Sequence, residues 1–341
     1  MNLADFWFIL IAVLWTGYLV LEGFDFGVGM LMPFVGKTRK GKRVLLNTIG
    51  PVWDGNEVWL LTAGGATFAA FPEWYATLFS GFYLPLLLIL VALIVRAVAI
   101  EYRGKINDQK WRDRWDIAII GSAWIPSILW GVAFANIVRG VPIDATGTYT
   151  GGFFNLLTPF ALLGGLTTLT IFLSHGSIFL SLKTAGTVRE RAESWAKKAS
   201  IVAIVVGAAW ALWLQLAYSE NAWTWGALVL AAVGLIGAAW FSRKDRFGLA
   251  FTLNALAIVG AVALIFGSLY PDVMPSSTDA AFSLTVDNAR SSHTTLVAMT
   301  WVAGIFTPVV LGYQAWSYWV FKRRLSEDHM PEHHELTFSK N

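Results

Sequence analysis

The sequence predicts an all-α integral membrane protein, and three observations lead to that class. The chain has 341 residues, of which 56% are hydrophobic and only 14% are charged. Its mean hydropathy of +0.58 lies far from the balance of a soluble globular chain. Apolar stretches of about 20 residues, the length of a membrane-spanning helix, recur along the chain, and none shows the alternation of a β-barrel strand.

Nine such stretches are predicted to be transmembrane helices, because a segment in lipid must satisfy its own backbone hydrogen bonds. Polar residues concentrate in the first three stretches, so we expect two four-helix bundles, one additional helix and a cytoplasmic tail within one polytopic domain, residues 1–341. The bundles would be residues 6–138, carrying the buried acids, and 154–270, followed by the ninth helix at 296–321 and the tail at 322–341. The nine stretches are residues 6–34, 52–71, 75–100, 117–138, 154–182, 200–218, 222–241, 247–270 and 296–321.

The first stretch carries two acidic side chains, Glu22 and Asp25. A carboxylate at membrane depth is costly unless it is protonated, paired or hydrated, so each acid indicates a functional site. The two are three residues apart and therefore share one face of a helix. Gly23 and Gly27 should let a neighbouring helix approach closely. The few residues before this stretch lack the basic leader of a signal peptide, so we expect it to be retained.

The second stretch opens with another acidic pair, Asp54 and Glu57, again three residues apart. Trp53 precedes the pair, and its ring could stack against a flat head group such as a quinone, although tryptophans are common at any membrane interface. Gly64 and Gly65 are expected to allow a further close helix contact.

The third stretch supplies one cation, Arg96, close to its inner end. Asp25 lies roughly 28 Å along the first helix at ~1.5 Å per residue, so both acidic pairs and Arg96 are expected at a similar depth. One guanidinium cannot neutralise four carboxylates. We therefore predict a proton pathway through Asp54, Asp25 and Glu57, with Arg96 as charge partner. The plainer alternative is that Arg96 neutralises one acid and the others are hydrated near the interface.

The remaining stretches offer little that could hold a metal. His175 is the only histidine within a predicted stretch, and no second ligand pattern accompanies it, so a packed histidine is favoured over a haem ligand. The chain has no cysteine, which excludes disulfides, iron–sulfur clusters and c-type haem attachment. His329, His333 and His334 form a weak metal-like tract, but a frayed polar terminus is favoured. No metal is expected on this chain alone.

The positive charges indicate orientation rather than nucleic-acid binding, despite a pI of about 9.0. Of the 25 Lys and Arg residues, 22 fall in alternate loops or the tail. The opposite loops hold only Arg139 and Arg290. By the positive-inside rule, the N-terminus lies outside and the C-terminus lies in the cytoplasm.

Long motifs in this sequence resemble subunit II of the cytochrome bd-type quinol oxidases, and the nine-span plan and length fit that family over the whole chain. Two motifs carry most of the resemblance: residues 22–31 (EGFDFGVGML) and 51–60 (PVWDGNEVWL). Shorter matches are residues 62–66 (TAGGA), 79–83 (FSGFY), 131–134 (GVAF) and 156–160 (LLTPF), together with Asp116.

The resemblance implies a respiratory enzyme of bacterial or archaeal cell membranes that oxidises quinol and reduces dioxygen to water. In that family the b-type and d-type haems belong to subunit I, so this chain would be the non-haem partner in a heterodimer that often includes a small single-span accessory subunit. Asp54 matches the family acid assigned to proton uptake at the subunit interface. Asp25, Trp53 and Arg96 match residues that surround a structural quinone in some members.

Two other classes compete with this interpretation. A stand-alone ion- or proton-coupled secondary transporter would use the same acids and Arg96 to bind a substrate or coupling ion, but corresponding broken helices in two repeats are not evident. A purely structural anchor would leave the acids dispensable.

Overall fold

The structure of the protein is a computed structural model that describes residues 2–330. That part of the chain is mostly helical. Its α-helices are α1 (Leu3–Val35), α2 (Arg39–Ile49), α3 (Trp53–Ala70), α4 (Pro72–Gly81), α5 (Tyr83–Tyr102), α6 (Gln109–Arg139), α7 (Pro159–Lys183), α8 (Gly186–Ala217), α9 (Thr224–Arg243), α10 (Phe247–Leu269) and α11 (His293–Val320). The short elements are the strands β1 (Asp272–Met274) and β2 (Leu284–Thr285) and the 3-10 helices η1 (Phe153–Leu156), η2 (Ala280–Phe282) and η3 (Glu327–His329).

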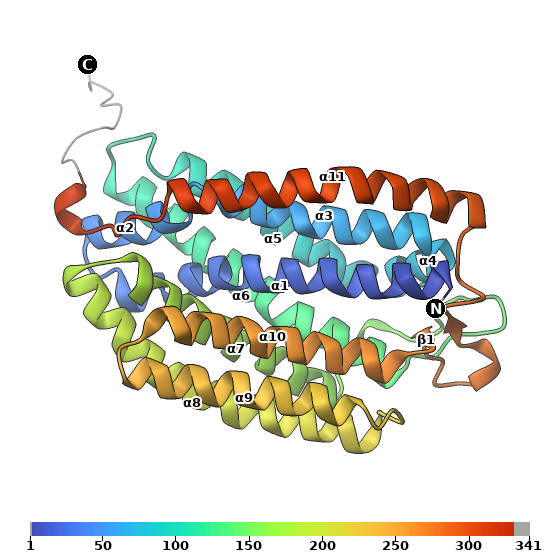
Figure 1. Ribbon diagram of the computed structural model, residues 1–341. Helices are drawn as coiled ribbons and strands as arrows, with labels where there is room; N and C mark the ends of the chain where they lie inside the picture. Colours follow the sequence, from blue (N-terminus) through green and yellow to red (C-terminus); the bar gives the residue numbers. More distant parts are fainter. Residues whose placement is uncertain (1, 331–341) are drawn as a thin grey trace.

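Helix α1 lies in the middle of the molecule, with α3, α5 and α11 to one side of it and α7, α8, α9 and α10 to the other (Figure 1). It packs against α3, α6, α7 and α10, so both parts of the chain meet on it. The predicted all-α membrane class is confirmed. The central position of α1 also places its acidic residues where several helices can supply partners.

Eight helices in the described residues are long and apolar enough to cross a membrane, namely α1 and α5 to α11. Helix α3 is the predicted span that is absent from this set. Its first two turns contain Asp54, Asn56 and Glu57, which lower its hydropathy. The polar residues that make α3 a candidate site helix therefore also keep its mean hydropathy below that of a typical membrane span.

The predicted span at residues 75–100 is not one helix. The chain leaves helical geometry at Phe82, so α4 ends at Gly81 and α5 begins at Tyr83. Pro85 explains the break, because a proline ring inside a continuous helix clashes with the carbonyl four residues earlier, here that of Gly81. Pro85 instead lies in the first turn of α5, where proline is tolerated.

Several helix boundaries differ from the predicted spans because hydropathy detects apolar residues rather than helical ones. Helix α8 begins at Gly186 instead of Ser200, and α7 begins at Pro159 instead of Phe154. Helix α2 was not expected, since its basic residues indicated a loop. It is amphipathic, it buries Val44 and Leu45, and Thr38 caps its first turn.

The predicted close approach at Gly27 exists, whereas the one at Gly64 and Gly65 does not. A Cβ on Gly27 would lie 2.7 Å from Cα of Gly176 on α7, so the two backbones meet at this crossing. A Cβ on Gly64 or Gly65 would meet nothing within 4 Å in the described residues. Helix α3 therefore presents these two glycines to an open side.

The segment between α10 and α11 is folded rather than a plain solvated loop. Strands β1 and β2 pair antiparallel within it. The Val141 amide donates to the Pro275 carbonyl at 3.1 Å, and the Ser277 amide donates to the Val141 carbonyl at 2.9 Å. These bonds tie the segment to the chain just after α6.

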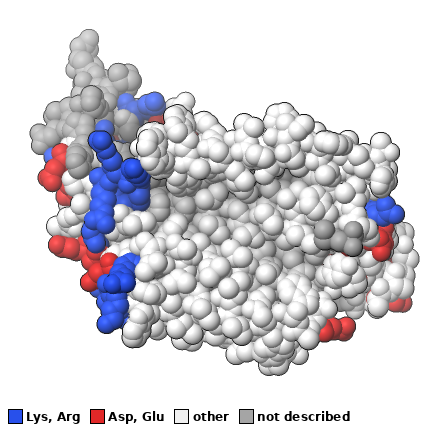
Figure 2. Space-filling view, in the orientation of Figure 1, with Lys and Arg blue, Asp and Glu red and all other residues white. Residues whose placement is uncertain are grey.

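Lys and Arg gather at one end of the molecule in the view of Figure 2. It is the end at which α2 lies and α11 finishes (Figure 1). Helix α1 begins at the opposite end. The membrane helices therefore separate a strongly basic end from one with few cations.

Candidate functional site

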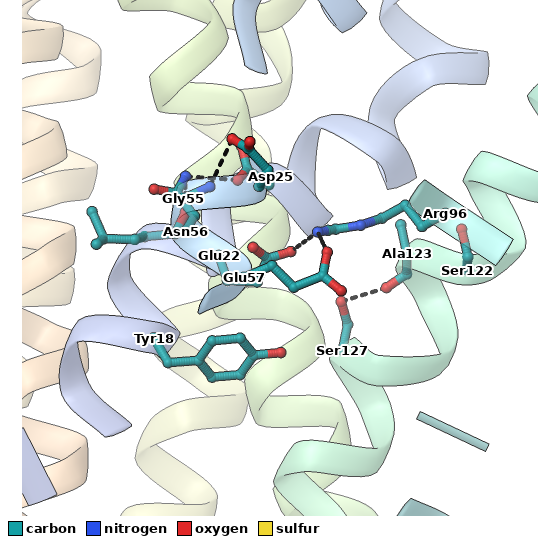
Figure 3. Close-up of polar contacts among 12 residues, drawn as sticks. Tyr18, Glu22, Asp25, Gly55, Asn56, Glu57, Arg96, Ser122, Ala123 and Ser127 are labelled. Carbon is teal, nitrogen blue, oxygen red and sulfur yellow. Dashed lines mark hydrogen bonds and ion pairs between the residues drawn. The ribbon is translucent and has the colours of Figure 1, made fainter. Parts of the chain in front are cut away.

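Arg96 connects three helices at the centre of the site. It projects from α5, is 2% exposed, and forms an ion pair with the fully buried Glu22 of α1. Its Nη2 also contacts Oε2 of Glu57 on α3 at 3.1 Å, and the Glu57 side chain is 22% exposed. Figure 3 shows both carboxyl groups meeting the guanidinium. Arg96 therefore bridges one buried acid and one partly hydrated acid.

Aromatic rings border the guanidinium on two sides. The Phe26 ring centroid lies 4.7 Å from the Arg96 Cζ, and the Trp53 ring centroid lies 6.0 Å from it. The weakly hydrated guanidinium plane suits such aromatic contacts. Its Nε and Nη1 are buried and have no hydrogen-bond acceptor among the described residues. These two nitrogens are therefore donors that no acceptor among residues 2–330 satisfies.

Asp25 is buried but is not an ion-pair partner of Arg96. Its Oδ2 accepts a hydrogen bond from Nδ2 of Asn56 at 2.7 Å, as Figure 3 shows. Its Oδ1 has no partner among the described residues, and the same holds for Oε2 of Glu22. Both acids therefore keep one buried oxygen that can accept a proton.

Asp54 lies apart from the buried cluster. It is exposed at the first turn of α3, where its Oδ1 accepts from the Gly55 amide at 2.7 Å. The expected common layer of four acids thus resolves into Glu22, Asp25 and Glu57 around Arg96, and one acid at the surface. Because Glu57 follows Asp54 by three residues, the two share a helical face and form a line from the surface toward Arg96.

Sequence reasoning missed two residues of α11, although a signal was available. Gln314 and Tyr318 are four residues apart in a mainly apolar helix, the spacing that places two side chains on one face. The Asn56 Oδ1 accepts from the Tyr318 hydroxyl at 2.7 Å and from the Gln314 Nε2 at 3.2 Å. Asn56 itself was overlooked between the two acids of its own motif.

Tyr18 is a further buried polar group that the sequence did not single out. It lies one turn before Glu22 on α1 and is fully buried, and its hydroxyl accepts from the Trp130 indole at 3.0 Å. Figure 3 shows its ring on the side of the cluster opposite Asp25. It closes the cluster toward the N-terminal end of α1.

A second ionic cluster lies at the basic end. Asp116 of α6 accepts from Nζ of Lys42 at 2.8 Å and pairs with Arg103, which follows α5. Asp116 is 3% exposed and Arg103 is 6% exposed. These contacts hold α2, α5 and α6 together, so the role of this cluster is structural.

His175 is placed as a packed residue. It is fully buried, its Nε2 lies 3.1 Å from the Val20 carbonyl, and its ring stacks on Phe251 with centroids 4.5 Å apart. Within residues 2–330, no group of three or more His, Cys, Asp or Glu side chains could hold a metal ion. His333 and His334 of the tail lie outside the described residues.

The arrangement can pass and hold protons. Glu22 and Asp25 of α1 each keep one oxygen without a partner among the described residues, and the partly exposed Glu57 and the exposed Asp54 lie on α3. Arg96 forms ion pairs with two of these carboxyl groups, Glu22 and Glu57, so its single positive charge cannot balance every acid of the cluster if all are ionised.

Comparison with known proteins places the whole chain in one group. The family model described as "Cytochrome bd terminal oxidase subunit II" matches residues 3–321. The chain is 42% identical over 331 residues to the "Cytochrome bd ubiquinol oxidase subunit 2" of Bacillus subtilis, covering 95% of this chain and 97% of that protein. It is 36% identical over 368 residues to the "Cytochrome bd-I ubiquinol oxidase subunit 2" of Escherichia coli, covering 97% of each.

A solved structure shows the same fold. It is a chain of the bd oxidase from Geobacillus thermodenitrificans, with a TM-score of 0.77 and 17% sequence identity. The match covers 94% of this chain and 99% of that one.

Proposed function

Since this chain belongs to the cytochrome bd terminal oxidase subunit II family and is thus a subunit of a quinol oxidase complex, we propose that it carries protons from the cytoplasm toward the site of oxygen reduction. The haems and the oxidation of quinol belong to the partner, subunit I. This chain stabilises that partner and takes part in no redox step itself.

The proton path runs from Asp54 through Glu57 to the buried acids. The observation that carries this proposal is the graded exposure of the acids: Asp54 is exposed, Glu57 is 22% exposed in its side chain, and Asp25 is 1% exposed. A proton relay needs a hydrated acid at one end and buried acids with free oxygens beyond it. The chain presents both within two adjacent helices.

The proposed orientation puts the N-terminus outside and the C-terminus in the cytoplasm. It is supported by the gathering of Lys and Arg at the α2 end (Figure 2) and by the positive-inside rule. Asp54 lies at the start of α3, directly after α2, and so faces the cytoplasm. This topology needs α3 as a ninth crossing, with residues 6–138 and 154–270 as the two bundles.

The haem-bearing partner is proposed to cover the side formed by α3, α5 and α11. That side exposes Asp54 and Gly65 of α3 next to large apolar residues such as Leu61, which is 72% exposed. An acid and small residues on a membrane face indicate a protein neighbour rather than lipid alone. A single-span accessory subunit could add to the same assembly.

A quinone head group fits the site as a structural ligand. Arg96 has two buried donors without an acceptor, Trp53 offers a ring beside it, and Asp25 keeps one free oxygen. Arg96 would donate to a quinone oxygen while Trp53 packs against the ring. The test is the quinone content of purified complex, which Trp53→Ala should lower without loss of haem.

The decisive experiment replaces Asp54 by Asn in the complete oxidase. An amide nearly matches the carboxylate in shape but cannot carry a proton, so turnover per haem-bearing complex should fall while haem content and quinol binding persist. Proton uptake from the cytoplasmic side of sealed vesicles should fall in parallel. Asp113→Asn, at another exposed acid of the basic end, is the matched control. Normal turnover and uptake in Asp54→Asn would remove Asp54 from the relay.

A further inference from the structure

Helix α11 is exposed along its middle and less exposed toward its two ends within the described residues. Residues 304–313 are all exposed, although a helix packed along its length would bury a residue in every turn. Leu296 is its only fully buried residue in the described structure. Pro308 lies in the middle of the exposed run, where a proline bends a helix.

Hydrogen bonds as well as apolar contacts fasten both ends. At the outer end, the Trp7 indole donates to the Leu296 carbonyl at 3.2 Å and to the Thr300 hydroxyl at 3.0 Å. At the inner end, Gln314 and Tyr318 both donate to the side-chain oxygen of Asn56. The inner attachment therefore ends on the residue that holds Asp25.

The Trp59 indole determines which groups donate and which accept in the hydrogen-bond network at the inner end of α11. The Trp59 indole can only donate a hydrogen bond, and it donates to Oε1 of Gln314 at 2.8 Å. The Gln314 amide must then turn its Nε2 toward Asn56, which receives it on Oδ1. Asn56 in turn must present Nδ2 to Asp25. Each donor faces an acceptor only in this order.

All hydrogen-bonding positions of the Asn56 side chain are occupied. Its Oδ1 accepts from Gln314 and Tyr318, and its Nδ2 donates to Asp25 and, at 3.3 Å, to the Leu21 carbonyl. The amide is 0% exposed, so water cannot replace a lost partner. Turning it over would break every one of these bonds.

We propose that Gln314 and Tyr318 make Asn56 a positioning residue for Asp25. Asn56 engages Oδ2 and leaves Oδ1 as the oxygen that takes the proton. This inference rests on the proposed proton path and adds α11 to it. The donor on Oδ2 holds that oxygen, so the network leaves Oδ1 as the position at which Asp25 exchanges a proton.

Other charged and titratable groups also lie near Asp25. Glu22 precedes it on α1, Glu57 lies on α3, and Arg96 on α5 pairs with both of those acids. The Tyr318 hydroxyl is the titratable group contributed by α11. None of these groups bonds to Oδ1 of Asp25, so Asn56 alone decides which of its oxygens is engaged.

The experiment removes the two α11 donors by Tyr318→Phe and Gln314→Met in the complete oxidase. Asn56 is then free to turn its oxygen toward Asp25, and only a protonated Asp25 can donate to that oxygen. Infrared spectra should show a new carboxylic-acid carbonyl band that disappears when Asp25→Asn is added. The pH dependence of turnover should move to higher pH. Tyr270→Phe, which removes a hydroxyl that donates to Asp5 at 3.2 Å away from the cluster, is the matched control and should change neither.

The outcomes separate this inference from the proposed function. An unchanged infrared spectrum and pH profile in the double variant would overturn the positioning role, even if Asp54→Asn still slows turnover. A new band in the double variant, together with normal turnover in Asp54→Asn, would keep the positioning role and remove the proton path. If the double variant does not assemble, Tyr318→Phe alone carries the same test with one donor lost.

Discussion

Arg96 faces more negative charge than it can neutralise, and its two ion pairs differ in kind. Glu22 is fully buried, whereas the Glu57 side chain is 22% exposed. Breaking a buried pair leaves a charge that water cannot reach, while an exposed acid can be rehydrated. The stability of the site therefore depends on the Arg96–Glu22 contact more than on the Arg96–Glu57 contact.

Arg96→Gln should destabilise the assembled complex by about 3–5 kcal/mol, the range for a buried charge left without its partner. The measurement is the melting temperature and the yield of haem-bearing complex. Adding Glu22→Gln should restore part of the loss, because the uncompensated acid is then gone. Unchanged melting in Arg96→Gln would show that the ion pair contributes little.

At the scale of elements, close backbone contacts and buried ions decide which helices meet. Helices α1 and α7 cross where Gly27 faces Gly176. At the basic end, Asp116 joins α2, α5 and α6 through Lys42 and Arg103. Both contacts connect residues far apart in the sequence, and each can be tested separately from the proton path.

Gly27→Ala should lower the stability of the chain, since the added methyl group meets backbone that cannot move aside; overpacking of this kind costs about 1–3 kcal/mol. Gly121→Ala on α6 is the control, because a Cβ there would meet nothing within 4 Å. Thermal unfolding in detergent compares the two. Equal melting temperatures would contradict the close crossing.

Asp116→Asn should be more harmful than Lys42→Met. The amide leaves the buried Arg103 without a countercharge, whereas the Lys42 side chain is 26% exposed and a partly hydrated pair contributes only about 0–1 kcal/mol. The yield of folded chain and its melting temperature should rank the variants in that order. The reverse order would show that Arg103 is neutralised elsewhere.

At the scale of the whole molecule, one side of the chain is incomplete by itself. Helix α11 is exposed along its middle, and α3 presents an acid and open glycines next to it. A subunit that covers this side would bury the start of the proposed proton path at the interface. If the proposed path holds, assembly and proton transfer would depend on the same surface.

The chain expressed alone should show no haem spectrum, and co-expression with subunit I should yield b-type and d-type bands. The reason is the ligand inventory: the sequence has no cysteine, and His175 faces a backbone carbonyl. His175→Ala should accordingly leave the number of haems per complex unchanged. A haem band from the isolated chain would contradict this expectation.

The sequence by itself determined the membrane class, the approximate spans and the acids that lie within them. These features depend on local composition, because hydrophobicity, helical periodicity and charge are properties of short stretches. The two motifs at residues 22–31 and 51–60 were also sufficient to suggest the family. The amphipathic α2 was missed because its basic residues indicated a loop, and the break at Phe82 was missed because it does not alter hydropathy over a span-length window.

Only the tertiary structure decided which partners the polar residues have. The sequence placed Asp25, Glu57 and Arg96 at one depth, but the rotation of each helix about its axis depends on side chains from distant parts of the chain. Because of that rotation, Arg96 forms ion pairs with Glu22 and Glu57, whereas Asp54 lies at the surface. It also lets Tyr318 of α11 donate a hydrogen bond to Asn56. Depth is encoded locally, whereas the direction in which a side chain points is set by the helices packed around it.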